Sequence, residues 1–263
     1  MKLTILAALF VCVLVLSPCA SAQAGYVLTE VRQGVQQQTY VQDNTIKFVH
    51  PTGQEMIFDL KDGQLCIVNH KLKGYWKGTA EDFKTQLRQS VMAQMEKAAE
   101  KMPPEQREAF KQAMTKMFDD SPQPGAPEPK FEVKATSEKA DVAGYGTTKY
   151  EVWVDGQLRE EMWMAEGCKV YQELDMKKMA AFMKVFPGGG KKDNYEASPE
   201  VVALYKKGWP LKTAKALPGG QRFVTETAKV EEKSIPASAF KAPDEYKAMD
   251  LLSVTGGPVG AGG

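Results

Sequence analysis

The sequence has very little histidine and no excess of charge of either sign. Only two histidines, His50 and His70, occur in 263 residues, which leaves few candidates for a catalytic base or a metal ligand. Residues 1–22 contain one lysine and no acidic residue, so the remainder has 33 basic and 33 acidic residues. Proteins that bind nucleic acid carry surplus lysine and arginine for the phosphates. The composition therefore argues against a nucleic-acid partner and against histidine catalysis.

Long apolar runs are also rare, and the one that occurs stands at the start of the chain. Lys2 precedes the apolar stretch 3–16, and residues 20–22 (Ala-Ser-Ala) have the small side chains that signal peptidase recognises. An apolar run of about 14 residues is shorter than the roughly 20 that a membrane-spanning helix needs. We therefore predict a signal peptide over residues 1–22, a periplasmic or secreted protein, and no stable transmembrane segment after signal removal.

Cysteine is scarce as well. Cys12 and Cys19 lie in the predicted signal peptide, so the mature chain keeps Cys66 and Cys168 in a compartment that permits disulfides. A bridge between them would close a loop of about 100 residues and stabilise the fold by about 4–5 kcal/mol in the chain-entropy model. We predict a Cys66–Cys168 disulfide. Two separate buried thiols are the alternative, and neither cysteine stands beside a histidine that would activate it.

What the sequence does contain is a series of short strands interrupted by amphipathic helices. Residues 25–76 alternate in polarity between turn signals, which predicts a meander of strands. Apolar residues then recur at helical spacing over residues 79–119, with a break at the prolines 103–104. The proline-rich stretch 121–129 predicts an extended linker. Further strands are expected over 130–137, 147–154, 157–165, 211–217 and 222–232, and further helices over 174–185 and 198–207.

This succession of elements predicts an α+β fold with an antiparallel sheet covered by helices. About 240 mature residues fit one large domain of this class. We assign residues 23–250 to that single domain and residues 251–263 to a disordered Gly-rich tail.

Two Asp-Gly turns indicate which side chains share a face. A two-residue loop at residues 62–63 pairs Phe58 with Ile67. It collects Met56, Phe58, Leu60, Leu65 and Ile67 on one face and leaves a mixed face with Ile57, Cys66 and Val68, typical of a surface that another segment partly covers. The same reasoning at residues 155–156 places Tyr150, Val152, Val154 and Trp163 on one face and Trp153, Leu158, Met162 and Met164 on the other. Neither face of this second hairpin is wholly polar, so we expect apolar cover on both sides.

Methionine is abundant, with thirteen in the chain. Its unbranched thioether adapts to apolar partners of varied shape, which suits the lining of a ligand pocket. Ordinary core packing would explain the same pattern. The predicted ligand-binding residues on the helices and the second hairpin are Met92, Met95, Phe110, Met114, Trp153, Met162 and Met164.

No catalytic residue, metal site or cofactor is predicted. Glu160 and Glu161 are adjacent on a strand and therefore point to opposite faces, which argues against a pair of catalytic carboxylates. Four residues of strand separate Cys66 from His70 by about 13 Å, too far for one metal ion. The Gly-rich stretch 188–190 follows a predicted helix, whereas a phosphate-binding loop follows a strand. We expect a protein that is not an enzyme.

Three groups of short motifs resemble a known family. They are Ala143-Gly144-Tyr145 with Lys149-Tyr150-Glu151-Val152 and Glu161-Met162-Trp163-Met164-Ala165; Ser198-Pro199-Glu200 with Gly208-Trp209-Pro210; and Thr225-Glu226-Thr227 with Ile235-Pro236-Ala237. They resemble an uncharacterised family of exported bacterial proteins whose fold is similar to that of the periplasmic lipoprotein carrier. The resemblance implies a strongly curved, unclosed half-barrel wrapped around a few helices, with a cavity between them that suits an acyl chain.

The sequence and the resemblance together predict an exported, non-enzymatic binding protein. Its ligand would be a hydrophobic small molecule, a lipid or a lipoprotein held between sheet and helices. The alternative is an interaction or assembly module of the cell envelope, in which the uncovered face of the sheet docks a protein.

Overall fold

The chain folds around one sheet of twelve strands. The computed structural model describes residues 24–100, 102–103, 105–110, 128–183 and 195–256. From edge to edge the strands follow the order β12-β6-β5-β4-β3-β2-β1-β11-β10-β9-β8-β7. Every neighbouring pair is antiparallel except β12 and β6, which are parallel. The strands are β1 (Gly25–Arg32), β2 (Val35–Gln42), β3 (Thr45–His50), β4 (Gln54–Asp59), β5 (Gln64–Asn69), β6 (Gly74–Thr79), β7 (Phe131–Val142), β8 (Tyr145–Val154), β9 (Gln157–Ala165), β10 (Trp209–Ala216), β11 (Arg222–Lys233) and β12 (Lys247–Ala248).

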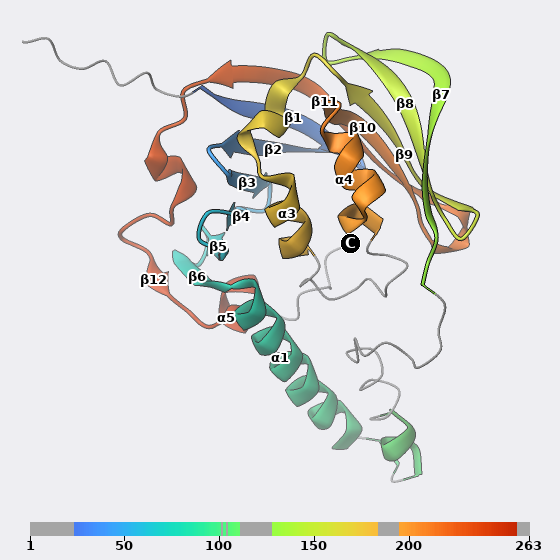
Figure 1. The fold of residues 1–263 in the computed structure, drawn as a ribbon. Coiled ribbons are helices and arrows are strands. Elements are labelled where there is room, and N and C mark those ends of the chain that lie inside the picture. The colour runs from blue at the N-terminus through green and yellow to red at the C-terminus, as the bar shows by residue number, and fades with distance from the viewer. Residues whose placement is uncertain (1–23, 101, 104, 111–127, 184–194, 257–263) are drawn as a thin grey trace, which may run out of the picture.

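The sheet is open and strongly curved, and short helices lie in its hollow (Figure 1). We call the side that faces these helices the inner face and the opposite side the outer face. The helices of the inner face are η1 (Lys169–Glu173), α3 (Met176–Met183), η2 (Tyr195–Ala197) and α4 (Pro199–Tyr205). The predicted α+β fold with an unclosed half-barrel is thus confirmed as an open, curved antiparallel sheet with few helices.

Helix α1 (Ala80–Glu100) starts at the end of β6 and projects away from the sheet (Figure 1). The hydroxyl and backbone amide of Thr79 both donate to the Asp82 carboxylate, and the Asp82 amide donates back to the Thr79 hydroxyl. This reciprocal capping fixes the start of the helix. Residues 105–110 are helical again, so the predicted interruption near the prolines occurs.

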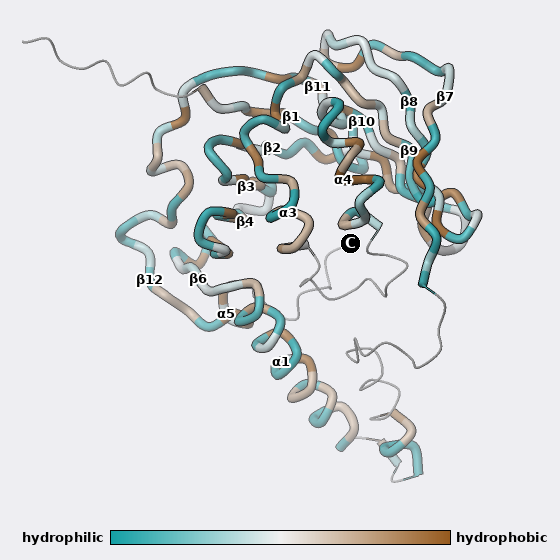
Figure 2. Tube along the Cα trace, in the orientation of Figure 1, coloured by the Kyte–Doolittle hydropathy of each residue, from teal (hydrophilic) through white to brown (hydrophobic). Residues whose placement is uncertain are grey.

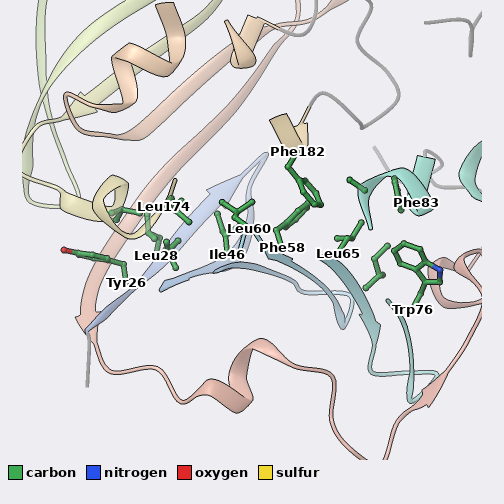
Figure 3. Packing of buried hydrophobic residues seen from close by; sticks show 14 of the residues in the cluster. Tyr26, Leu28, Ile46, Phe58, Leu60, Leu65, Trp76, Phe83, Leu174 and Phe182 are labelled. Carbon is green, nitrogen blue, oxygen red and sulfur yellow. The ribbon is translucent and has the colours of Figure 1, made fainter. Parts of the chain in front are cut away.

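The main hydrophobic core lies between β1–β6 and the helices of the inner face. Strand residues Leu28 and Phe58 lie there with Leu174, which follows η1, and Phe182 of α3 (Figure 3). The Phe58 and Phe182 rings pack edge to face, with centroids 5.1 Å apart. Along the strands hydrophobic and hydrophilic residues alternate (Figure 2), as expected for a sheet with two different faces.

The second apolar cluster lies between β7–β9 and α4. It joins Met162 and Met164 of β9 to Val201 and Leu204 of α4. The Ser198 hydroxyl accepts a hydrogen bond from the Val201 amide and caps α4, and Pro199 occupies the first turn of the helix. This start agrees with the helix predicted over residues 198–207, which ends at Tyr205.

The β4–β5 hairpin has the predicted faces but a different register. Phe58 pairs with Leu65 instead of Ile67, because the loop contains residues 60–63 instead of two residues. The Asp59 carboxylate accepts hydrogen bonds from the Lys61 and Asp62 amides and so begins the turn early. The shift amounts to two residues and therefore leaves every side chain on its predicted face.

The β8–β9 hairpin overturns the predicted faces. Asp155 and Gly156 form the expected two-residue turn with positive φ angles of 51° and 76°. A β-bulge follows, in which Val152 pairs with Glu160 while the next residue, Trp153, pairs with Leu158. The bulge adds one residue to β9 and reverses the alternation beyond it. Met162 and Met164 therefore share the inner face with Tyr150 and Val152, and Trp163 joins Trp153 outside.

The predicted C-terminal boundary is also wrong. The C-terminal strap, residues 234–246, leads to β12 and then to helix α5 (Leu251–Thr255), with η4 (Ala237–Phe240) on the way. Leu251 and Val254 are buried in the main core, and the side-chain amide of Asn69 donates a 2.9 Å hydrogen bond to the Val254 carbonyl. The domain thus continues past residue 250, and only residues 257–263 of the predicted disordered tail lie outside the described residues. The predicted signal peptide, residues 1–22, and the linker residues 121–127 lie outside them too.

The strap covers part of the outer face. Phe240, Ala242 and Tyr246 pack against Ile57, Cys66 and Val68 of the β4–β5 hairpin. This explains why the mixed face of that hairpin carries apolar residues, as its composition predicts. The outer-face apolar residues of β4 and β5 form a small core with a segment 172 to 189 residues later in the chain.

Candidate functional site

The inner face carries a row of polar side chains between its two apolar clusters. The register aligns Glu160 of β9 with Lys215 of β10, and Lys215 with Phe223 of β11. Arg32 at the end of β1 pairs with Thr225 of β11. We call this row the polar band; its members are Glu30, Arg32, Gln37, Thr39, Glu160, Thr213, Lys215, Thr225 and Thr227. Burying a polar group without a hydrogen-bond partner costs free energy. We therefore ask which member of the band is paired and which is not.

Glu160 is the most deeply buried acid of the band. Its residue surface is only 3 % exposed, and Oε2 accepts a 2.9 Å hydrogen bond from the Tyr195 hydroxyl. Burial raises the pKa of Glu160 to about 7, against the opposing effect of Lys215. The same burial, together with the Glu160 charge, raises the pKa of Tyr195, so that the phenol stays protonated. The Glu160 carboxyl group therefore changes its protonation state near neutral pH.

Lys215 lies between two carboxylates. It pairs across the strands with Glu160 and forms an ion pair with Glu196 of η2. Burial by itself lowers the pKa of Lys215, but Glu160 and Glu196 outweigh that effect and the pKa lies above its ordinary value. Lys215 therefore remains positively charged at neutral pH.

Glu30 is held by two neutral donors. The Thr39 hydroxyl and the Gln37 amide donate to Oε2 of Glu30 over 2.6 Å and 3.2 Å. Both donors are buried on β2, next to β1. The carboxylate is thus satisfied without a cation.

Arg32 has no such partner among the described residues. Its guanidinium lies over the Phe223 ring, 5.8 Å from the centroid. Its Nε is buried and has no hydrogen-bond acceptor, and the same holds for Nε of Arg159, the residue before Glu160. The polar band therefore contains paired acids and a paired lysine, together with an arginine that has an unused buried donor.

A second polar network lies on the outer face beneath the strap. Oε1 of Glu55 lies 3.3 Å from Lys47 Nζ and 3.1 Å from His70 Nε2. The other ring nitrogen of His70 is 2.8 Å from the Tyr246 hydroxyl, and Lys47 lies over the Tyr40 ring. This network, which we call the strap latch, ties the strap to β3–β5. It shows that His70 is a structural histidine of the outer face.

Glu160 and Glu161 point to opposite faces, as their adjacent positions predict. Glu161 forms ion pairs on the outer face with Arg222 and, over 3.0 Å, with Lys149. The Lys149 and Lys212 ammonium groups lie on the Trp163 ring, each 5.4 Å from its centroid. The outer face of β8–β10 is therefore a network of charged side chains over a tryptophan.

The structure distributes the predicted ligand-binding residues over three places. Met92 and Met95 belong to α1 and Phe110 to the helical residues 105–110, away from the sheet. Met162 and Met164 are buried under α4 on the inner face, whereas Trp153 lies on the outer face beneath Lys134. Met114 lies outside the described residues. The fold does not bring the described members of this set together.

The predicted disulfide is wrong in this structure. Cys66 and Cys168 are free buried thiols. Cys66 lies in the outer-face cluster under the strap, and Cys168 lies in the main core of the inner face. The sheet separates them, because residue 66 points outward from β5 while residue 168 follows β9 on the helix side. Burial raises the pKa of Cys66 to about 11 and also raises that of Cys168.

Sequence reasoning missed the polar band as a group. Its members come from β1, β2, β9, β10 and β11, and only strand order and register place them together. One available signal was the opposed pair Glu160 and Glu161, since one of the two had to face the helices. Within the described residues no group of three or more His, Cys, Asp or Glu side chains is arranged to hold a metal ion.

Two open grooves border these surfaces. One of about 710 Å³ runs over β7–β9 and is lined mainly by charged residues and threonines, together with Ala140, Gly146 and Met164. The other, of about 430 Å³, lies on the outer face of β1 and β11 and includes Val31, Val224 and Ala228. Val31 is 37 % exposed, so this groove presents apolar surface to solvent.

Residues 45–246 match the family described as Domain of unknown function (DUF4412). The chain belongs to this family. No curated protein matches the DUF4412 chain. None of the helices within the described ranges is sufficiently long and apolar to cross a membrane.

Solved structures similar to the DUF4412 chain include PNGF-II and MucB. PNGF-II in its C2 crystal form is 13 % identical, with a TM-score of 0.38, over 89 % of this chain and 32 % of PNGF-II. MucB is 14 % identical, with a TM-score of 0.38, over 86 % of this chain and 60 % of MucB. The Pseudomonas aeruginosa MucA/MucB complex gives 12 % identity and a TM-score of 0.37, over 89 % of this chain and 60 % of the matched chain. The chain thus spans about a third of PNGF-II and three fifths of MucB, and TM-scores of this size carry no inference about function.

Proposed function

We propose that the protein is an exported, non-enzymatic binding protein that holds an amphiphilic ligand, a lipid or a lipidated segment, against the inner face of its sheet. The observation that carries this proposal is the polar band between two apolar clusters. A purely structural interior of this size gains most from apolar packing, because buried charges cost desolvation energy. A ligand with one polar and one apolar part gives such a mixed face a purpose.

The apolar part of the ligand would contact the methionine-rich clusters. Met162 and Met164 lie under α4, and Met176 and Met179 of α3 pack against the main core. Thioether side chains repack around different apolar shapes at little cost. Helix α4 covers its cluster with only two fully buried residues, Val201 and Leu204, so a ligand that displaces it has few contacts to replace.

The absence of catalysis in this proposal is supported by how the titratable groups are arranged. Glu160 is bonded to Tyr195, and Lys215 is paired with Glu196. Neither pair includes a serine or cysteine nucleophile with a base beside it.

Extraction with organic solvent tests the proposal directly. We expect mass spectrometry of the extract from natively purified protein to show a co-purifying amphiphile, absent from protein refolded after denaturation. The refolded protein should then bind a fluorescent fatty-acid probe saturably and release it to unlabelled lipid. Neither an extracted amphiphile nor saturable probe binding would mean that the proposal is wrong.

The outer-face groove favours a second candidate function, docking of a protein segment. The strap already shows how this sheet accepts an extended chain, with Phe240 and Tyr246 inserted over β4 and β5. The groove at Val31, Val224 and Ala228 offers apolar surface on the same face without cover from the strap cluster. Val31→Glu should abolish capture of a protein partner in a pull-down from envelope extracts and leave amphiphile binding unchanged. Leu72→Glu, at a somewhat more exposed position away from the groove, is the control.

A further inference from the structure

Arginine is rare in this chain, and three arginines gather at one end of the sheet. Only five of the 34 basic residues are arginine. Arg32 is the last residue of β1, Arg222 the first of β11, and Arg159 the third of β9. These strands belong to the antiparallel succession β1-β11-β10-β9, so the three positions share one edge of the half-barrel.

The three arginines differ in what their guanidinium groups contact. Arg222 is occupied by Glu161 on the outer face. Arg32 and Arg159 each keep a buried Nε with no acceptor in the described part of the chain, and no ion pair of Arg32 occurs there. A buried donor without an acceptor is destabilising, and native proteins retain one chiefly where a water, an ion or a ligand completes it.

The surroundings of Arg32 suit an anion. The Phe223 ring lies against the guanidinium, and Lys215 is the register partner of Phe223 on β10. The Arg32 charge works to lower the pKa of Lys215. The acids nearby are already engaged: Glu30 by Thr39 and Gln37, Glu160 by Tyr195, and Glu196 by Lys215. None of these carboxylates forms an ion pair with Arg32 in the described part of the chain.

We propose that Arg32, with Lys215 beside it, binds the anionic group of the ligand, a carboxylate or a phosphate. The inference rests on the proposed function and names the class of amphiphile, one with an anionic head. The planar guanidinium presents parallel N–H donors that match two oxygens of such a group, which an ammonium cannot do. The head group lies at the arginine edge of the polar band, and the apolar chain lies along the methionine cluster.

Calorimetry with three probes tests the inference: lauric acid, monolauroylglycerol and inorganic phosphate. We expect Arg32→Gln to weaken lauric acid binding about tenfold or more and to change monolauroylglycerol binding less than twofold. Arg222→Gln is the matched control, since it removes an arginine of the same edge whose guanidinium is already bound. Arg32→Lys keeps the charge but loses the planar fork, and should give an intermediate affinity with a melting temperature like that of the wild type.

The outcomes separate the two proposals. If Arg32→Gln loses affinity for both lauroyl ligands equally, or for neither, the proposed anion site is wrong but the proposed binding function is not. Failure of the wild-type protein to bind any lauroyl ligand would overturn both. Phosphate that binds wild type but not Arg32→Gln supports an oxyanion site whose ligand is a free anion. Phosphate that binds both proteins equally counts against the site.

Discussion

The Tyr195 hydroxyl donates a 2.9 Å hydrogen bond to the Glu160 carboxylate in the interior between α4 and the sheet. This contact joins the segment before α4 to β9 and places a titratable group where burial raises its pKa to about 7. The structure therefore carries a proton whose loss destabilises the fold.

We predict that Glu160→Gln removes a pH dependence of stability. The pKa of Glu160 is 4.5 in a solvated chain and about 7 in the fold, so the folded protein holds the proton more tightly. Stability is then fully present below the unfolded value and falls as pH rises from about 4.5 to 7, by about 3 kcal/mol at most. Gln can still accept from Tyr195 but does not ionise. Urea unfolding should show that, between pH 5 and pH 8, the free energy of unfolding of the wild type falls by a few kcal/mol relative to that of Glu160→Gln.

Glu161→Gln is the control for that experiment. It removes the ion pairs with Arg222 and Lys149 on the outer face and should destabilise the protein at both pH values. Parallel pH curves for wild type and Glu160→Gln would contradict the role assigned to the buried carboxyl.

The strap latch predicts a local effect at the C-terminus. Tyr246→Phe keeps the ring in the outer-face cluster but removes the hydroxyl that lies 2.8 Å from His70. We expect a loss of about 0.5–1.5 kcal/mol. Hydrogen exchange should accelerate at two backbone amides: that of Lys247, which donates to the Lys73 carbonyl just before β6, and that of Met249, which donates to the Tyr75 carbonyl in β6. Tyr171→Phe, which loses only an exposed 3.4 Å contact, should leave exchange at both amides unchanged.

Leu204→Ala tests the packing of α4. Leu204 is 2 % exposed in the second apolar cluster, so its truncation leaves a cavity as well as losing apolar contact. The expected loss is about 2–5 kcal/mol in the free energy of unfolding. Leu72→Ala, at a position 49 % exposed, should cost less than about 0.5 kcal/mol. Similar losses for the two variants would show that α4 is not held on the inner face as described.

The two cysteines should titrate as free, protected thiols. A chain beginning at Gln23 should show two thiols per molecule after unfolding without reductant. In the folded state at pH 8 both should react slowly with an alkylating reagent, because burial raises the pKa of Cys66 to about 11 and that of Cys168 as well. Fewer than two thiols in the unfolded chain would contradict the free cysteines and support the disulfide that the sequence predicts.

Local patterns in the sequence predict the secondary structure well. Turn chemistry marks both hairpins, and Ser198 and Pro199 mark the start of α4. Side-chain faces follow from such patterns only where the strands are regular. They hold across Asp62-Gly63, where the shift is even, and fail across Asp155-Gly156, where one bulged residue reverses them.

The candidate site depends on information that spacing along the chain does not contain. Arg32, Lys215 and Glu160 meet only because β1 pairs with β11 and β10 lies between β11 and β9. The separation of Cys66 from Cys168 depends on the same arrangement, since one cysteine lies on each side of the sheet. Residues as far apart in the chain as Arg32 and Lys215 can be placed together only once strand order is known.

The pairing of β1 with β11 also bears on how the chain is assembled. Each of the strands β1–β6 pairs with its neighbours in sequence. The other edge of β1 pairs with β11, which comes almost 200 residues later in the chain, with Gly25 opposite Lys233. During synthesis the amino-terminal meander can therefore form while its exposed β1 edge stays open, and closing so long a loop is slow. If the chain is exported as proposed, the part that emerges first would carry this unfilled edge until residues 222–233 have followed, and a chaperone bound to that edge would protect it from pairing with other chains.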